Sequence, residues 1–212
     1  MSGGFRRHEG IAAPFLADNV NTDLIIPSRE MRRVSKLGLG EALFANLRYR
    51  DGARQPDPDF VLNRPAYAGA SLLLAGANFG CGSSREHAVW ALKDFGIRVV
   101  IAESFAGIFE SNCIANGLLP LALPSAEIAR LAEWCAGDPQ ARPLAVDLEA
   151  QQLTAGTRTL AFEIAPAARQ ALLSGVSPID RILSEEGETI RDFMARDCRR
   201  RPWLYREGEA AG

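Results

Sequence analysis

The sequence predicts an α/β fold with a parallel-sheet core and helices on its faces. Between residues 70 and 135, apolar runs of strand length alternate with segments whose apolar residues recur at helical spacing. Two of the predicted helices are followed by a glycine, Gly96 and Gly117, which tolerates the positive φ of a helix C-terminus. This alternation is typical of parallel strands joined by crossover helices.

Before this region the pattern is less regular. Turn formers fill residues 18–23, which favours a connection between strands over a loop that presents Asp23 and Thr22 to a site. Residues 28–36 carry four cations and few apolar side chains, which favours an exposed loop or short helix. The other expected elements are a strand at 11–17, a helix at 40–48 with Leu43, Phe44 and Leu47 turned inward, and a loop at 51–59.

The regular region is interpreted as three buried strands and three helices with one apolar face each. In chain order we expect a strand at 70–77, a helix from Ser83 to Phe95, a strand at 98–103, a helix at 105–116, a strand at 118–123 and a helix capped by Ser125. Cys113 and Cys135 fall on the apolar helix faces, so we expect both in the core.

After residue 140 the pattern changes to short strands, expected at 144–149, 152–154 and 159–164, with a hairpin turn at Ala155–Gly156. A final helix is expected from Ser177–Pro178, with its apolar residues turned inward: Ile179, Ile182, Leu183, Ile190, Phe193 and Met194. We expect a single domain over residues 1–212, with a helical extension from about residue 177 and a flexible tail from about residue 197.

Composition excludes several classes of protein. The net charge of −2 provides no basic field that would attract nucleic acid. No apolar run reaches the length of a membrane span, and the first ten residues lack a signal-peptide core, so we expect a cytoplasmic location and no membrane partner. The four cysteines are scattered and form no C-x-x-C pair, which argues against a zinc site or a self-contained iron–sulfur ligand set.

The stretch from Asn78 to Leu92 carries the strongest functional signal. A predicted strand runs into the loop Gly80–Cys81–Gly82 and then into a helix N-terminus, an arrangement that suits an anion. Ser83 and Glu86 also match the capping box S-x-x-E, which needs no function. The capping box leaves unexplained why two hydroxyls, a guanidinium and an imidazole gather here, on Ser83, Ser84, Arg85 and His87. From the pattern alone, function and structure explain this stretch equally well.

Four segments in one order resemble the aconitase superfamily: Asn19–Pro27 (NVNTDLIIP), Asn78–His87 (NFGCGSSREH), Ala102–Phe109 (AESFAGIF) and Asn116–Pro120 (NGLLP). More narrowly, the chain resembles the family of isopropylmalate isomerase small subunits from about Phe5 to Ile164. Four motifs in order are far more specific than G-S-S-R-E alone.

The resemblance implies the swivelling β/β/α domain, similar to the aconitase C-terminal domain, and activity only with a separate large subunit. In this family three cysteines of the large subunit hold a [4Fe–4S] cluster, whose open iron acts as a Lewis acid on the leaving hydroxyl. The cofactor is therefore expected on the partner and not on this chain. The implied reaction isomerises 2-isopropylmalate, a hydroxydicarboxylate, to 3-isopropylmalate by dehydration and rehydration in leucine biosynthesis.

The resemblance also implies residue roles. Ser83 matches the serine that acts as base in its alkoxide form, and Arg85 matches the arginine that clamps a substrate carboxylate through its planar fork. Ser84 would donate to the same carboxylate, and Asp23 matches an acidic residue that orients the network. A supporting shell is expected from Asn78, Cys81, His87 and Thr22, with no assigned role for His87.

The segment after Pro27 matches the family's substrate-specificity loop, which places four residues near the substrate: Arg29, Glu30, Met31 and Arg32. Many relatives carry an aromatic residue followed by Leu where this chain has Glu30–Met31, and Asn21 replaces a common Asp. These departures keep related hydratases open, acting on citraconate, dimethylmaleate or homoaconitate-type diacids.

Two non-enzymatic alternatives also remain. A phosphate- or nucleotide-binding module is disfavoured because no Gly-Lys-Ser/Thr follows the glycines and no G-x-G-x-x-G is present. A regulatory or assembly subunit would make Ser83 and Ser84 dispensable.

Overall fold

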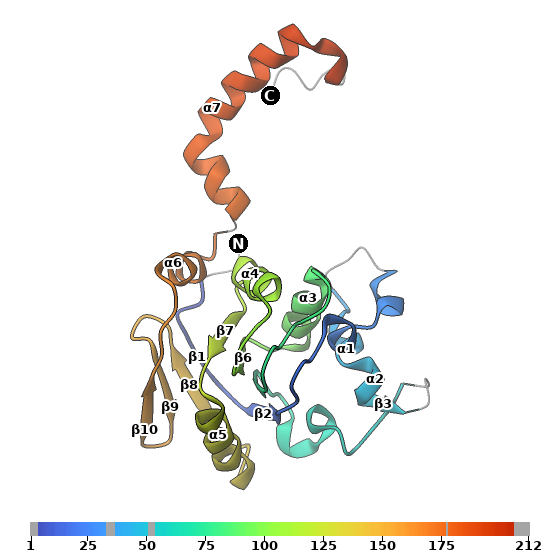
Figure 1. Cartoon of the computed structure of the whole chain (residues 1–212), viewed down its shortest axis with the longest axis vertical. Helices are drawn as coiled ribbons and strands as arrows, with labels where there is room; N and C mark the ends of the chain where they lie inside the picture. The colour runs from blue at the N-terminus through green and yellow to red at the C-terminus, as the bar shows by residue number, and fades with distance from the viewer. Residues whose placement is uncertain (1–3, 33–36, 51–53, 177, 206–212) are drawn as a thin grey trace. The chain divides into compact units, whose positions relative to one another are not determined.

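A four-stranded parallel sheet lies at the centre of the larger of two units (Figure 1). The structure is a computed structural model that describes residues 4–32, 37–50, 54–176 and 178–205. The chain divides into a unit of residues 1–175 and a unit of residues 176–212. The sheet order is β2 (Ala12–Phe15), β5 (Leu72–Ala75), β6 (Val99–Ala102) and β7 (Leu119–Ala122), and every neighbouring pair is parallel.

The sheet separates two hydrophobic cores because alternate residues of its strands point to opposite faces. Leu73 and Ala75 of β5 pack in one core, together with α3 (Glu86–Phe95) and α4 (Gly107–Ala115). Leu72 and Leu74 pack in the other core, with α5 (Ser125–Gly137). The parallel sheet covered on both faces is therefore confirmed.

The expected strands and helix ends are mostly confirmed within a few residues. Gly96 (φ +116°) and Gly117 (φ +69°) have the positive φ predicted for them, and both Cys113 and Cys135 are buried. The starts of helices α3, α4 and α5 differ from the prediction, and α3 begins at Glu86 instead of Ser83. Helix α4 begins at Gly107 instead of residue 105, and Pro124 takes the N-cap position expected for Ser125.

A second sheet covers part of the second core. It is antiparallel, in the order β1 (Arg7–Gly10), β8 (Leu144–Asp147), β9 (Gln152–Ala155) and β10 (Arg158–Ala161). The three later strands match the sequence-based expectation. The sequence did not indicate β1, whose residues Arg-His-Glu-Gly lack an apolar alternation. It also did not indicate α6 (Pro166–Ser174), which buries Leu172 in the same core.

Short elements connect β2 to β5: α1 (Thr22–Ile25), η1 (Ser28–Arg32), η2 (Gly40–Ala42), α2 (Ala45–Arg48), β3 (Tyr49–Arg50), β4 (Gln55–Pro56), η3 (Val61–Asn63) and η4 (Pro65–Tyr67). The continuous helix expected at 40–48 is wrong, because the chain breaks at Phe44 (φ +50°) between η2 and α2. The break lets Phe44 pack against the rings of Phe15 and Phe60, at centroid distances of 5.1 and 5.8 Å.

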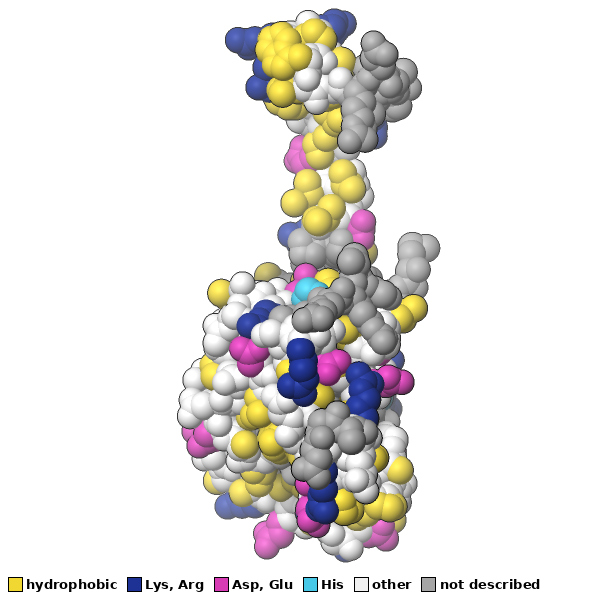
Figure 2. Space-filling view, turned by 90° about the vertical axis from the view of Figure 1, so that its right-hand side faces the viewer, with side chains coloured by type: hydrophobic (Ala, Val, Ile, Leu, Met, Phe, Trp, Pro, Cys, Tyr) yellow, Lys and Arg dark blue, Asp and Glu magenta, His cyan; other side chains and the backbone are white. Residues whose placement is uncertain are grey.

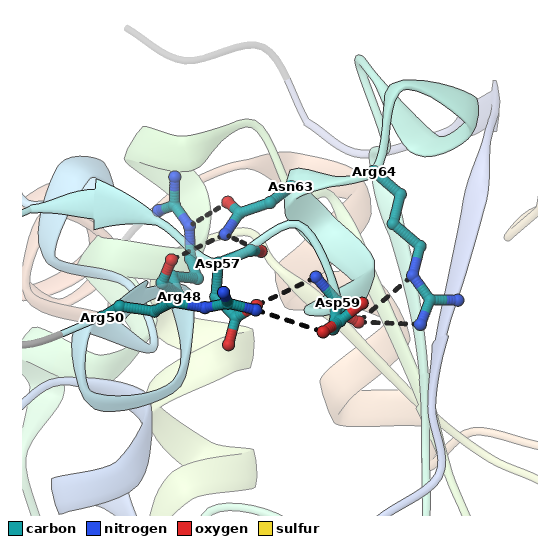
Figure 3. A network of polar contacts seen from close by, with 6 residues as sticks. All are labelled: Arg48, Arg50, Asp57, Asp59, Asn63 and Arg64. Atoms are coloured by element: carbon teal, nitrogen blue, oxygen red, sulfur yellow. Dashed lines mark hydrogen bonds and ion pairs between the residues drawn. The ribbon is translucent and has the colours of Figure 1, made fainter.

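A polar network ties these short elements together (Figure 3). The Asn63 amide donates to the backbone oxygens of Arg48 (2.6 Å) and Asp57 (2.9 Å). Arg50 pairs with Asp57 and Asp59, and Arg64 donates to the Asp59 backbone oxygen at 2.7 Å. Since these charged groups pair with one another, we interpret the network as a structural one that stabilises the β3–β4 hairpin.

The second unit contains α7 (Pro178–Arg200) and a short η5 (Pro202–Leu204). The tail expected from Asp197 starts inside this helix, and Asp197 accepts hydrogen bonds from Arg201 and Tyr205. The inward orientation expected for the apolar residues of α7 is wrong. Five of them are 44–69% exposed, namely Ile179, Ile182, Leu183, Phe193 and Met194, and Figure 2 shows hydrophobic side chains along this helix. Helical periodicity identifies an apolar face but not what covers it.

Candidate active site

The candidate site lies where two loops run side by side at the carboxyl edge of the parallel sheet. One loop follows β2 and the other follows β5. Four backbone hydrogen bonds join them: Gly76 N to Ala17 O (3.2 Å), Asn19 N to Ala77 O (2.8 Å), Gly80 N to Val20 O (2.7 Å) and Thr22 N to Cys81 O (2.9 Å). Residues far apart in the sequence are thereby held in one register.

Positive φ angles shape both loops. Asn19 (φ +54°) and Asn78 (φ +55°) occupy the left-handed region, which asparagine tolerates better than most residues. The Asn78 side-chain amide donates to Asn19 Oδ1 at 2.9 Å, and the Asn78 backbone N–H donates to Ser104 Oγ at 2.9 Å. Asn78 therefore holds the loops together, and Ser104 is a supporting residue that the sequence reasoning missed.

Helix α3 starts later than the sequence predicted, and its capping box does not form. The first helical residue is Glu86, and the N-cap residue is Arg85, without a side-chain cap. The Glu86 carboxylate instead accepts a hydrogen bond from the Asn116 amide at 2.7 Å. The Arg85 backbone N–H donates to Ser83 O at 2.8 Å, so Ser83 belongs to a turn before the helix. The capping interpretation of Ser83 is wrong.

An ion pair connects the two loops. Arg85 Nη1 donates to Asp23 Oδ1 in a short contact, and Ser28 Oγ donates to the same oxygen at 2.8 Å. The guanidinium of Arg85 and the Ser28 hydroxyl lower the pKa of the Asp23 carboxyl below its ordinary value. Asp23 is therefore ionised at neutral pH. The sequence analysis did not predict Ser28 as a site residue. Its position just after the single turn of α1 is the feature that could have indicated it.

Thr22 brings a second hydroxyl to Ser83. Its side chain is only 2% exposed, and Thr22 Oγ1 lies 3.1 Å from Ser83 Oγ and 3.2 Å from Ser83 O. Asn21 caps the short helix α1 by accepting from Leu24 N at 2.8 Å, which fixes the direction in which Thr22 and Asp23 point. The structure thus brings together Thr22, Asp23, Ser83 and Arg85.

The remaining expected residues lie around this group with weaker connections. Ser84 is exposed, and in the described part of the chain no hydrogen bond of its hydroxyl is found. Cys81 is half-buried and bridges to Asn21 through the backbone. The His87 ring packs against Trp90, with 4.6 Å between the centroids, on the side of α3.

The expected specificity loop forms η1, and its acidic residue, Glu30, forms ion pairs with two arginines. The Glu30 carboxylate, 21% exposed, pairs with Arg54 at 3.1 Å and with Arg29 at 3.4 Å. Arg54 also pairs with Glu41, so it links η1 to η2. The side chains of Met31 and Arg32 lie outside the described part of the structure.

The described residues do not provide a cluster or metal site of their own. No group of three or more His, Cys, Asp or Glu side chains that could hold a metal ion occurs in the ranges given above. The four cysteines are free thiols on separate elements, and burial raises the pKa of Cys113 and Cys135. These donors do not fit a three-thiolate cluster. No helix in the described ranges has the length and apolar character needed to cross a membrane.

Comparison with known proteins identifies the family. A family model described as the aconitase C-terminal domain matches residues 2–126. A 3-isopropylmalate dehydratase small subunit from Cupriavidus necator is 53% identical over 207 residues, which cover 96% of this chain and 99% of the relative. The chain belongs to the family of 3-isopropylmalate dehydratase small subunits.

Further relatives agree with this assignment. A small subunit from Methylibium petroleiphilum is 46% identical over 209 residues, covering 94% of this chain and 96% of the relative. The crystal structure of a 3-isopropylmalate dehydratase from Methanocaldococcus jannaschii superimposes with a TM-score of 0.65 at 28% identity, covering 88% of this chain and 99% of that one. The family span of residues 2–126 includes every residue of the candidate site. The resemblance and the aconitase-type fold are therefore confirmed, and the name "small subunit" implies a large-subunit partner.

Proposed function

We propose that this chain supplies the base and the carboxylate-binding residues of a hydro-lyase that isomerises 2-isopropylmalate to 3-isopropylmalate in leucine biosynthesis. The observation that carries the proposal is the meeting of Thr22, Asp23, Ser83 and Arg85 at the joined loops of a family member. Dehydration needs a base beside a carboxylate-binding cation, and this group offers both.

Ser83 is the proposed base. It accepts a proton from the carbon next to a substrate carboxylate and returns a proton when water is added back. A free serine hydroxyl is too weakly acidic to ionise, so its anion needs a donor nearby. Thr22 Oγ1 is placed to donate, but its single proton can serve either Ser83 O or Ser83 Oγ. In the alkoxide state the Thr22 proton turns to Ser83 Oγ, so Thr22 is a positioning residue of the base.

Arg85 is the proposed carboxylate clamp. Its guanidinium has five N–H donors in a planar fork, and Asp23 uses one nitrogen of that fork. The ion pair holds the guanidinium in place before substrate arrives, and Ser28 holds the Asp23 carboxylate in turn. Ser84, exposed beside Arg85, is proposed to donate to the same substrate carboxylate.

The loop of residues Arg29, Glu30, Met31 and Arg32 is proposed to determine which alkyl side group of the substrate is accepted. Because Arg54 and Arg29 hold the Glu30 carboxylate, its charge is partly neutralised before any alkyl group approaches. The alternative substrates are citraconate, dimethylmaleate and homoaconitate-type diacids.

The [4Fe–4S] cluster is proposed to be bound by the large subunit, because the donors of this chain do not fit it. Bound there, the cluster would supply Lewis-acid chemistry to the leaving hydroxyl. The protein is proposed to act in the cytoplasm, as expected for a soluble biosynthetic enzyme.

The test is an anaerobic assay of the chain combined with a candidate large subunit. Ser83→Ala tests the base directly, because Ser83 does not cap α3 and its loss should not destabilise the helix. We expect its turnover to fall by about 10²–10⁴-fold, the usual contribution of a general base. The melting temperature and the complex with the large subunit should stay unchanged.

Ser111→Ala is the matched control, since Ser111 is an exposed helix serine whose hydroxyl donates to Gly107 O at 2.9 Å. Turnover of Ser83→Ala within about tenfold of the wild type, below any general-base effect, would remove Ser83 as the base. Activity on citraconate but not on 2-isopropylmalate would retain the reaction type and change the substrate.

A further inference from the structure

Positive side chains line a cavity of about 400 Å³ in the larger unit, away from the candidate active site. The cavity is lined by residues 4–8 together with Lys93, Arg98 and Gly117. Arg98 directly precedes β6 and Gly117 precedes β7, whereas the loop with Ser83 follows β5. Because parallel strands all run in one direction, the cavity and the candidate active site lie at opposite edges of the sheet.

The lining is basic and contains no carboxylate. Arg6, Arg7, Lys93 and Arg98 contribute to it, together with His8. Arg6 pairs with Glu149. In the described part of the chain, Arg7 and Arg98 make no ion pair with any carboxylate. Arg7 and Arg98 therefore bring positive charge to the cavity with no carboxylate of the described residues within ion-pair distance.

Contacts with two helix ends hold the cations at the cavity. Lys93 Nζ donates to the backbone oxygen of Asn116, and Arg98 Nη1 donates to Lys93 O at 3.2 Å. The carbonyl end of a helix carries a partial negative charge, so these contacts orient the two side chains at the cavity. Asn116 is in turn fixed to α3 through Trp90 and Glu86.

His8 lies on the wall of the same cavity. Its Nε2 lies 2.7 Å from Ser71 Oγ, so the ring is held on the cavity wall. Burial and, after it, the charge of Arg98 lower the pKa of His8 below its ordinary value. The ring is then neutral at physiological pH and leaves the arginines and the lysine as the charged groups.

We propose that this cavity is a binding site for a small oxyanion that bears phosphate or carboxylate groups. The cations provide charge-assisted hydrogen bonds, and arginine forks match the geometry of both kinds of oxyanion. The volume lies in the range of small-molecule sites. No residue of this cavity belongs to the proposed catalytic group, so the inference goes beyond the proposed function. Helix α3 spans both places, with Arg85 at its N-cap and Lys93 in its last turn.

The test is titration of the full chain with pyrophosphate and, separately, with succinate, at constant ionic strength set by chloride. Isothermal calorimetry gives the affinity. The test variant is the double substitution Arg7→Gln and Arg98→Gln. Arg7 is exposed on β1, so its substitution leaves the packing intact, and the melting temperature checks the fold of the double variant. Arg130→Gln is the control, because Arg130 is an exposed arginine on α5.

We expect millimolar or tighter binding of at least one of the two probes. The double variant should weaken it at least about tenfold, the loss expected for hydrogen bonds to charged groups, while Arg130→Gln stays within about twofold. Arg85→Gln should bind pyrophosphate like the wild type, which separates this cavity from the candidate active site. Binding of pyrophosphate alone would assign a phosphate ligand, and binding of succinate alone a carboxylate.

The inference is overturned if neither probe binds at millimolar concentration. It is also overturned if the double variant binds as tightly as Arg130→Gln, or if Arg85→Gln alone abolishes the binding of pyrophosphate. None of these results would bear on the assay with the large subunit, so the two proposals fail separately.

Discussion

Gly80 should be one of the least replaceable residues of the chain, and Gly80→Ala tests the loop geometry directly. Gly80 has φ +78°, and a Cβ added there would lie 2.1 Å from Cγ of Phe109 and 2.5 Å from its Cδ1. Phe109 is buried, with its ring against Phe79, so it has little room to move. Two separate penalties therefore apply to one methyl group.

The magnitude follows from these penalties. A left-handed backbone conformation costs a non-glycine residue about 1–2 kcal/mol, and overpacking a core costs about 1–3 kcal/mol. The expected loss is about 2–5 kcal/mol. For a protein of this size each kcal/mol lowers the melting temperature by about 2–4 °C, so Gly80→Ala should lower it by about 4–20 °C.

Two other glycines serve as matched controls in the same thermal unfolding experiment, followed by circular dichroism. Gly82 has φ +95°, but its added Cβ meets no atom closer than 3.5 Å, so Gly82→Ala should cost only the backbone penalty of about 1–2 kcal/mol. Gly107 starts α4 with no atom within 4 Å, and alanine there should be neutral or stabilising by up to about 1 kcal/mol. Equal melting temperatures for Gly80→Ala and Gly107→Ala would refute the reasoning about this loop.

Three further predictions test other parts of the structure. Thr22→Val removes the hydroxyl near Ser83 and should lower turnover about 10–100-fold, the effect of one hydrogen bond to a charged group. Thr22→Ser keeps a hydroxyl and should retain the turnover of the wild type. Equal turnover of Thr22→Val and the wild type would exclude Thr22 from positioning the base. Arg54→Gln should cost less than about 1 kcal/mol in thermal unfolding, since the Arg54 side chain is half exposed. The substitution should nevertheless change the relative kcat/KM among alkyl malates, and an unchanged ratio would argue against a role of Glu30 in specificity. The pKa of His8 is lowered from 6.5, so the fold favours the neutral ring: this stabilisation is present above pH 6.5 and is lost as the pH falls through the folded-state pKa. Unfolding of the wild type and of His8→Gln, compared at neutral and acidic pH, should show a smaller loss on acidification in the variant, and identical losses would contradict the assignment.

The parallel sheet was predictable because its physical causes are local. Buried strands such as residues 99–102 need apolar side chains on both faces, and the glycines at 96 and 117 sit where helices must end. β1 was not predictable, since its strand conformation depends on pairing with β8, more than 130 residues away in the sequence. Its own residues offer no apolar alternation. The same argument applies to α7, whose periodicity correctly indicated a helix but not its surroundings.

The start of α3 shows why the residue types of a site are easier to predict than its geometry. The S-x-x-E pattern predicted that Ser83 and Glu86 form a capping box, because the neighbouring sequence contains no competing hydrogen-bond partner for either side chain. In the fold, Glu86 meets Asn116 and Ser83 meets Thr22, and both partners arrive through tertiary contacts. Ser83 is thereby released from the helix and placed beside a hydroxyl that can stabilise its anion. The side-chain oxygen of a capping residue accepts hydrogen bonds from backbone N–H groups, so the absence of the cap leaves the Ser83 oxygen available for its proposed role as the base.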